Sequence, residues 1–417
     1  MIILQQEYSW LFNAYNLDYF INEHWSKLPT TWKNCLETMN NIKDIVYILE
    51  PTTNQTKFLF PLSLLCLKKL SLMIRYLKPL TSVDHILCRG IKLKKRHEID
   101  RLCKVIPSLM ASTPDCNNII DVGSGQGHLP RILTLCYNYR VYCIEANCDN
   151  VSGATNHDHR VLKALKKYKF SNITPEAMPS KVNCFLTNEH KIDDLVGNGD
   201  ELNGGHLLMG LHACGPLSNL IIDEFVNNPK SRALVLACCC YMKAGIDFFP
   251  MSSFLKQNIK FQLSAEAKEL ACHAVEKFLN KFATNDLDSL KVHGYRACLE
   301  LIIEKCCPWQ RHKAMRSVKI DSSMSFIDYV AKATRGLNVE INDEIMNSSM
   351  VLECLQLIDR VVIFYSLRLL VAPIVEHFIL LDYQDYLSEQ KAVKETCLMP
   401  LFDPLVSPRN LILIAKK

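Results

Sequence analysis

The sequence predicts a doubly wound α/β fold, in which helices cover both faces of a mostly parallel sheet. Three observations support this fold class. Short apolar runs rich in β-branched residues alternate with helical segments between residues 86 and 242. A glycine-rich loop at residues 123–127 directly follows one of these runs and opens a helix. The run at residues 233–237 is apolar throughout, as expected for a strand that is buried on both faces.

Five strands are expected in this region, and helices are expected between them. The strands are predicted at residues 119–120, 141–144, 184–186, 206–211 and 233–237. Helices are predicted at residues 128–136 and 216–226, and Pro216 suits the first turn of the second one. This alternation predicts parallel strands joined by right-handed crossovers.

The chain of 417 residues is longer than most single cores, so we divide it into four regions. Residues 1–85 are expected to form a helical N-terminal region that includes a helix at 62–76. Residues 86–242 form the predicted core. The other two regions are a helical insertion at 243–356, with helices at 265–282 and 295–304, and a return to the core at 357–417, with a last helix at 358–370 and strands at 377–381 and 410–415.

Composition limits the classes of protein to consider. An apolar fraction of 49% and a charged fraction of 22% are typical of a folded soluble protein. The 19 cysteines are scattered and follow no secretory leader, so we expect reduced thiols and a cytoplasmic or nuclear location. Without a Cys-x-x-Cys pair, no metal site is predicted. The apolar stretches at 58–67 and 361–381 are too short or too charged to predict a membrane span.

The glycine loop is the first candidate site, and its sequence is Asp121-Val122-Gly123-Ser124-Gly125-Gln126-Gly127. A dinucleotide loop would place its third glycine at His128, and a phosphate loop would need Lys followed by Ser or Thr. Asp121 would repel a pyrophosphate but would suit a cationic ligand such as S-adenosylmethionine. Glu145 ends the second strand, followed by Ala146, and a carboxylate there can accept both ribose hydroxyls.

We therefore predict an S-adenosylmethionine-dependent methyltransferase with a Rossmann-like class I methyltransferase core. The predicted cofactor-binding residues are Asp121, Gly123, Ser124, Gly125, Gln126, Gly127, Glu145 and Ala146. The glycine spacing disfavours an enzyme that uses a nicotinamide dinucleotide.

Two further motifs end the fourth and fifth strands, Leu211-His212-Ala213-Cys214-Gly215 and Cys238-Cys239-Cys240-Tyr241. Ligands of open α/β sheets bind at the carboxyl ends of strands, so both motifs should face the reacting methyl group. His212 is the first candidate base and His97 the second. Cys214 and Cys240 could be small buried side chains, could shape an acceptor pocket beside His212, or could act as a pair of covalent nucleophiles.

The chain resembles the methyltransferase-like protein 25 family, which includes the ribosomal RNA adenine dimethylase domain-containing proteins. The matching pieces are 94–98, 121–128, 211–215, 239–242, 249–252, 401–404 and 407–410. The resemblance implies that Lys95, His97 and Glu98 lie near the cofactor pocket. His-x-Cys-Gly after the fourth strand, with Cys-Cys after the fifth, is also similar to tRNA 2′-O-methyltransferases of the acceptor stem. That similarity implies RNA as the substrate class.

Two basic clusters agree with an RNA substrate, because Lys and Arg bind phosphates. They are Lys92, Lys94, Lys95, Arg96 and Arg101, and Arg160, Lys163, Lys166, Lys167 and Lys169. Such clusters are also common on solvated helix faces. Two other functions therefore stay open: a protein or small-molecule methyltransferase, and a catalytically inactive methyltransferase fold that acts as a binding module. The sequence indicates no particular protein partner.

Overall fold

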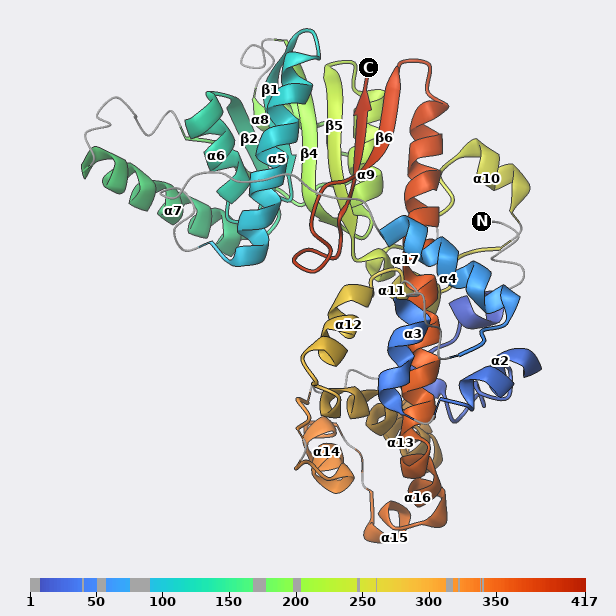
Figure 1. Ribbon diagram of the computed structural model, residues 1–417. Coiled ribbons are helices and arrows are strands. Elements are labelled where there is room, and N and C mark those ends of the chain that lie inside the picture. The colour runs from blue at the N-terminus through green and yellow to red at the C-terminus, as the bar shows by residue number, and fades with distance from the viewer. Residues whose placement is uncertain are drawn as a thin grey trace. The chain divides into compact units, whose positions relative to one another are not determined.

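The structure is a computed structural model, and its chain forms two compact units. It describes residues 8–39, 41–50, 58–75, 91–167, 178–197, 204–245, 248–259, 261–312, 318–321, 323–337, 339 and 341–417, with backbone alone at 72–75 and 165–167. One unit comprises Met1–Tyr76 and Ser264–Glu376, and the other comprises Leu77–Leu263 and His377–Lys417. We call them the helical unit and the sheet unit (Figure 1).

The sheet unit contains a seven-stranded sheet in the order β3-β2-β1-β4-β5-β7-β6. Its strands are β1 (Cys116–Val122), β2 (Arg140–Glu145), β3 (Ser180–Asn183), β4 (Gly205–Cys214), β5 (Ser231–Cys239), β6 (Glu395–Pro400) and β7 (Leu411–Lys416). Among these strands, β7 pairs antiparallel with both β5 and β6, and all the other pairs are parallel. The predicted Rossmann-like α/β fold class is confirmed. The strand order reverses between β1 and β4, where such sheets open a crevice for ligands.

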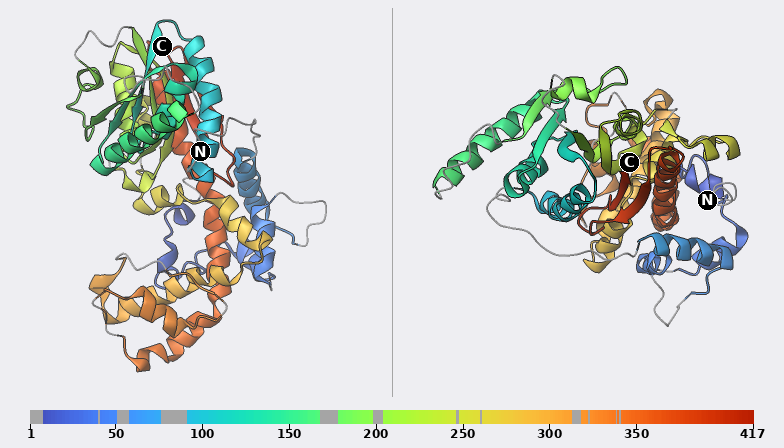
Figure 2. Two further views of the ribbon diagram at one scale, coloured as in Figure 1. Left: turned by 90° about the vertical axis from the view of Figure 1, so that its left-hand side faces the viewer. Right: turned by 90° about the horizontal axis from the view of Figure 1, so that it is seen from above.

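Helices cover both faces of this sheet (Figures 1 and 2). Met209 packs with Leu102 and its helical neighbours, so α5 lies on one face. Side chains alternate between faces along a strand, and a Cβ added to Gly210 would come within 2.9 Å of Ile221 on α9. The helices are α5 (Leu93–Ala111), α6 (His128–Tyr137), α7 (Cys148–Lys167), α8 (Ile192–Val196), α9 (Leu217–Asn227), α10 (Ser253–Asn258) and the end of α17.

The helical unit has its own apolar core, which includes Tyr295, Leu299 and Tyr329. Its helices are α2 (Thr30–Leu36), α3 (Val46–Leu49), α4 (Leu62–Arg75), α11 (Ala265–Leu270), α12 (Val275–Ala283), α13 (Lys291–Cys306), α14 (Phe326–Ala333), α15 (Asp343–Met346), α16 (Ser349–Gln356) and the first part of α17. The 3₁₀ turns are η1 (Asn16–Asp18), η2 (Ile42–Ile45), η6 (Asp288–Leu290) and η7 (Pro308–Gln310), with η4 (Tyr241–Lys243) in the sheet unit. The single helix predicted at 265–282 is thus two helices, α11 and α12.

Helix α17 (Ile358–Ser388) corrects two predictions near the C-terminus. The strand predicted at 377–381 is wrong, because these residues continue the helix predicted to end at 370. In an apolar run that is buried on all sides, polar residues do not recur at a fixed spacing, so the sequence does not distinguish a strand from a helix. The strand before β7 is instead β6, at Glu395–Pro400. Within the described part of the chain, no helix combines the length and apolar character needed to cross a bilayer.

The third strand is also displaced from its predicted place. Residues 184–186 were expected to form it, but β3 (Ser180–Asn183) ends just before them. β3 pairs with β2 through Ile144 and Glu145, which lie opposite Val182 and Asn183. The strand is short and largely polar, so its sequence lacks the apolar run that marks the other strands. The displaced residues Cys184, Phe185 and Leu186 line a pocket instead.

Candidate active site

The glycine loop connects β1 to α6 in a backbone conformation that requires glycine. Gly123, Gly125 and Gly127 have φ angles of 76°, 58° and 64°, in the left-handed region that side chains disfavour. The Gly123 amide donates a hydrogen bond to the Ile144 carbonyl oxygen at 2.8 Å, which holds the loop against β2. Gly127 is the N-cap of α6. The loop therefore turns tightly at the carboxyl ends of β1 and β2.

The carboxylate of Glu145 is fixed by this loop. Its Oε2 accepts a hydrogen bond from the Gly125 amide at 2.7 Å, and its Oε1 accepts one from the Asn147 amide at 2.9 Å. Asn150 Nδ2 donates to the same Oε1 at 3.3 Å. Two carboxylate oxygens offer about four acceptor sites, so Glu145 can accept a further hydrogen bond. The end of β2 thus presents an oriented acceptor beside the glycine loop.

Asp121 lies beneath the loop and is only 2% exposed. Its Oδ1 has no hydrogen-bond partner among the described residues. Burial raises the pKa of its carboxyl to about 7, Lys95 on α5 opposes that rise, and Glu145 adds to it. A buried carboxylate oxygen without a hydrogen-bond partner is costly unless a ligand satisfies it. The chemistry of this position fits a cationic group.

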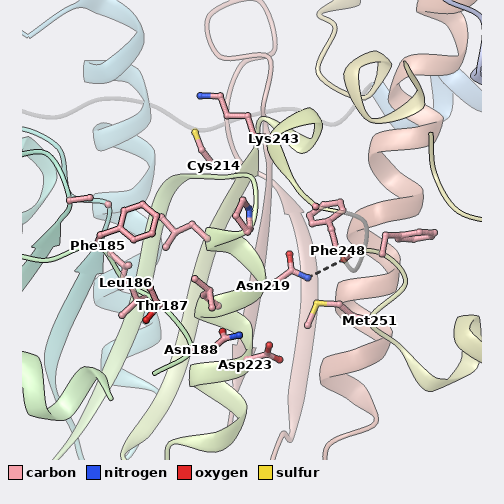
Figure 3. A pocket seen from close by; sticks show the side chains of 18 of the residues that line it. Phe185, Leu186, Thr187, Asn188, Cys214, Asn219, Asp223, Lys243, Phe248 and Met251 are labelled. Atoms are coloured by element: carbon pink, nitrogen blue, oxygen red, sulfur yellow. Dashed lines mark hydrogen bonds between the residues drawn. The ribbon is translucent and has the colours of Figure 1, made fainter. Parts of the chain in front are cut away.

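A pocket of about 1030 Å³ lies at the carboxyl ends of these strands (Figure 3). Drug-sized ligands occupy pockets of about 300–1,000 Å³, so a cofactor and part of an acceptor can fit. Of the predicted site residues, those that line it are Gly123, Glu145, Ala146 and Cys214. Ser124, Gln126 and Gly127 belong to the adjoining turn: the Gly127 amide donates to the Ser124 carbonyl oxygen, and Gln126 packs against Gly153.

The pocket also contains residues that the sequence analysis did not select. Phe185 lies after β3 with its side chain 74% exposed, Asp223 lies on α9, and Lys243 follows β5. Tyr386, which also lines the pocket, donates a hydrogen bond to Asp223 Oδ1 at 3.0 Å. No motif marks these residues, because they come from separate elements and share only their position at one edge of the sheet.

His212 forms a hydrogen-bonded pair with Glu98 on α5. Its Nε2 lies 2.8 Å from Glu98 Oε1, and Ser407 Oγ donates to the same oxygen at 2.7 Å. Burial raises the pKa of Glu98, but the hydrogen bonds from His212 and Ser407 and the charge of Lys95 lower it to about 2. An ionised carboxylate only accepts, so His212 Nε2 is the donor. In a neutral ring, Nδ1 is then the free acceptor.

The backbone at His212 is unusual. Its φ is 69°, and the pairing of β4 with β5 shifts register between Leu211 and Ala213. A histidine in the left-handed region costs energy, and such strain collects at functional sites. The His212 ring is not among the pocket-lining side chains; it precedes Cys214, which is. The pair with Glu98 therefore sits at the strand end rather than deep in the pocket.

His97, the second candidate base, takes part in a different contact. Its Nε2 accepts a hydrogen bond from the Asp403 amide at 2.8 Å, and its ring packs edge-on to Phe402. It does not line the pocket. With its acceptor nitrogen engaged, His97 holds the loop around Asp403. The family-like motif at residues 94–98 on α5 therefore makes two separate contacts. Glu98 contacts His212, and His97 contacts the loop around Asp403.

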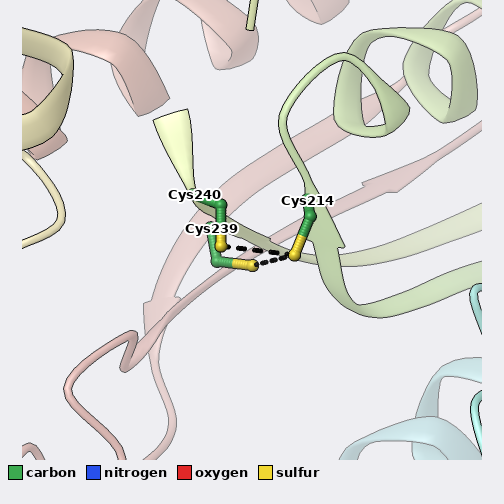
Figure 4. A group of neighbouring side chains, drawn as sticks. All are labelled: Cys214, Cys239 and Cys240. Carbon is green, nitrogen blue, oxygen red and sulfur yellow. Dashed lines mark hydrogen bonds between the residues drawn. The ribbon is translucent and has the colours of Figure 1, made fainter. Parts of the chain in front are cut away.

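Three thiols meet at the ends of β4 and β5 (Figure 4). Cys214 Sγ lies 3.2 Å from Cys239 Sγ and 3.3 Å from Cys240 Sγ. The hydrogen bonds that Cys214 shares with Cys239 and Cys240 lower the pKa of Cys214 to about 5. The sequence analysis selected Cys214 and Cys240, which the structure brings together, but not Cys239.

Gly215 sets how closely the loop after β5 approaches β4. Its φ is 58°, and a Cβ there would lie 2.9 Å from Lys243 Cβ and 3.2 Å from the Lys243 carbonyl carbon. Gly125 has the same φ, but a Cβ there would meet no atom within 4 Å. An alanine at residue 215 would therefore add both backbone strain and steric overlap, whereas an alanine at residue 125 would add backbone strain alone.

Gly215→Ala should lower the free energy of unfolding of the sheet unit by about 2–5 kcal/mol, from backbone strain plus overpacking. Gly125→Ala should cost only the strain, about 1–2 kcal/mol. Urea unfolding of both variants measures the difference. Equal losses would mean that the loop moves away from residue 215 without cost.

Residues 94–245 of the chain match the family model described as "Methyltransferase domain". The chain is also similar to two proteins named "Probable methyltransferase-like protein 25". The human protein is 28% identical over 257 residues, covering 57% of this chain and 40% of its own length. The mouse protein is 24% identical over 284 residues, covering 64% and 46%. The predicted resemblance to the methyltransferase-like protein 25 family is confirmed.

The matched region spans less than half of the length of these relatives. A solved structure, M. capricolum TrmK in complex with the cofactor product S-adenosyl-homocysteine, aligns with 32% of this chain and 50% of that chain. The alignment has 15% sequence identity and a TM-score of 0.20.

Proposed function

We propose that the sheet unit binds S-adenosylmethionine and transfers its methyl group to a nucleophile on RNA. The observation that carries the cofactor assignment is the buried carboxylate of Asp121 beneath a glycine loop, whose Oδ1 has no hydrogen-bond partner among the described residues. A cationic amino acid moiety would satisfy that carboxylate, and Glu145 would accept a hydrogen bond from a ribose hydroxyl. When bound, the cofactor supplies an electrophilic methyl group on a sulfonium.

The residues of this chain would act mainly by positioning. Gly123 lets the ligand approach the backbone, and the amides of Gly125 and Asn147 orient Glu145. Phe185 offers an exposed aromatic face for a base. His212 Nδ1 would accept the proton of the nucleophile, and Glu98 would stabilise the resulting imidazolium.

Glu145→Ala should weaken binding of S-adenosylhomocysteine by about 1.5–3 kcal/mol, because a charged acceptor of a ribose hydroxyl is lost. Calorimetry on the full chain measures this. Glu145→Gln is the matched control, since it keeps the size and one acceptor oxygen, and its loss should be smaller. Unchanged affinity in Glu145→Ala, or equal binding of a nicotinamide dinucleotide, would contradict the cofactor assignment.

The RNA part of the proposal rests on basic side chains near the start of α5. Lys92 and Lys94 are exposed, and Lys95 and Arg96 are half-buried, whereas Arg101 is buried and cannot meet a phosphate. In the second cluster only the side chains of Arg160 and Lys163 lie among the described residues. The charged residues that line the pocket are mixed in sign: Glu145, Asp223, Lys243 and Lys256.

The substrate class can be tested by transfer of labelled methyl from S-adenosylmethionine to fractionated cell RNA and protein, with Asp121→Ala as the control. Label in RNA that is lost in the control supports the proposal. Label confined to protein or small molecules would favour a protein or small-molecule methyltransferase. A chain that binds the cofactor but labels no fraction would be a binding module.

A further inference from the structure

We propose that Cys214, Cys239 and Cys240 form a mononuclear zinc site with three thiolate ligands and one open position. Their three sulfur atoms lie within 4.8 Å of one another, and all three come from the carboxyl ends of β4 and β5. This inference goes beyond the proposed methyl transfer and does not depend on it.

The spacing of the sulfurs is closer to that of metal ligands than to that of a disulfide. A Zn–S bond of about 2.3 Å in tetrahedral geometry places two sulfurs about 3.8 Å apart. Cys214 Sγ is 3.2 Å from Cys239 Sγ and 3.3 Å from Cys240 Sγ. Small side-chain rotations of about half an ångström would reach the zinc spacing. A disulfide needs about 2.05 Å and would leave the third thiol unused.

The backbone is shaped to bring adjacent cysteines together. Consecutive side chains in a strand point to opposite faces, so Cys239 and Cys240 would normally diverge. Cys240 instead has a φ of 51°, in the left-handed region, and ends the strand there. This conformation is unfavourable for a residue with a side chain and persists where surrounding structure imposes it. It lets both thiols approach Cys214 (Figure 4).

The charge balance of such a site is reasonable. All three cysteines would bind as thiolates, and three thiolates with Zn²⁺ carry a net charge of −1. The Lys243 ammonium is close enough to act electrostatically on Cys214 and Cys240. It would partly compensate that charge. Thiolate ligands favour soft ions such as Zn²⁺ over Mg²⁺ or Ca²⁺.

The fourth position of the zinc would be reached from the pocket, because Cys214 and Lys243 both line it (Figure 3). Zinc sites with three protein ligands and an open position are typically catalytic, and closed four-ligand sites are typically structural. A pocket water or an acceptor group could occupy the position. The pocket of the sheet unit would thus hold a Lewis acid beside the proposed cofactor site.

The test is the zinc content of the full chain purified under reducing conditions without chelator. We expect about one zinc per chain in the wild type. Loss of a residue that only hydrogen-bonds to a metal ligand weakens metal binding by about 10–100-fold. Cys214→Ser and Cys239→Ser each remove a ligand itself, so they should weaken zinc binding by more than that. Cys397→Ser, which changes an exposed cysteine on β6, is the matched control and should keep its zinc.

Cobalt substitution in the wild type keeps the test decisive if a cysteine variant fails to fold. Chelator-treated protein with Co²⁺ should show thiolate charge-transfer bands and ligand-field bands of a tetrahedral site. A wild type without zinc and without these bands would overturn the proposal, as would a Cys214–Cys239 disulfide in protein purified without oxygen. Binding of S-adenosylhomocysteine, measured on the same samples, reports separately on the cofactor assignment.

Discussion

His212→Asn should reduce the rate of methyl transfer by about 10²–10⁴-fold, the usual worth of a positioned general base. Asparagine is chosen because it tolerates the left-handed backbone that His212 adopts, with its φ of 69°. The substitution therefore removes the imidazole without adding backbone strain. The assay uses whichever cell fraction the wild type labels, and binding of S-adenosylhomocysteine is measured alongside it and should be unchanged.

Glu98→Gln separates the base from the residue that positions it. The amide oxygen introduced by this substitution could still accept a hydrogen bond from His212 Nε2, but a neutral amide would not stabilise an imidazolium. The rate should therefore fall, but less than in His212→Asn. Ser407→Ala removes only one hydrogen bond to Glu98, worth about 0.5–1.5 kcal/mol. Full turnover in His212→Asn would refute the assignment of the base, whatever the other two variants do.

The sequence predicted the sheet well where strands are buried on both faces. The unbroken apolar run of β5 and the glycine loop after β1 each have a direct physical cause, namely burial and a tight turn. The prediction failed where a strand lacks an apolar run, and where a helix has the same apolar run as a buried strand. β3 is short and polar, so no apolar run marks it, and α17 is apolar on all sides, so residues 377–381 resembled a strand.

The residues of the candidate site also differ in how far the sequence could predict their arrangement. Residues carried by one contiguous motif, Asp121 and the glycines, could be predicted because the loop itself creates the geometry. The pair of His212 with Glu98 joins residues 114 positions apart, and only the packing of α5 on the sheet brings them together. Cys239 was missed because strand alternation predicts that it points away from Cys240. The φ of Cys240 reverses this, and no residue type in the sequence marks that angle.

The burial of Asp121 predicts that the affinity for S-adenosylhomocysteine depends on pH. Burial raises the pKa of its carboxyl to about 7, so it is partly protonated at neutral pH in the free protein. The charged and titratable groups around it are Lys95 on α5, which opposes the rise, and Glu145 on β2, which adds to it. Cys143 on β2 also faces it, and burial raises the pKa of that thiol, so it stays neutral. Its β4 neighbour Met209 carries no charge.

A ligand ammonium favours the ionised form of Asp121, so binding below pH 7 must release a proton. Affinity for S-adenosylhomocysteine should therefore fall up to about tenfold per pH unit as pH drops below about 7, and should level off above it. Asp121→Asn should bind about 10–150-fold more weakly above pH 7, for the loss of about 1.5–3 kcal/mol from a charged hydrogen bond.

The same variant should also lose the dependence between pH 7 and pH 5. The ligand's own α-amino group stays protonated between pH 5 and pH 7 with both proteins, so the difference between them isolates Asp121. Calorimetry in buffers of different ionisation enthalpy counts the released proton directly. If wild type and Asp121→Asn show parallel pH profiles, the carboxylate does not meet the ligand's ammonium, and the glycine loop serves a neutral or anionic ligand.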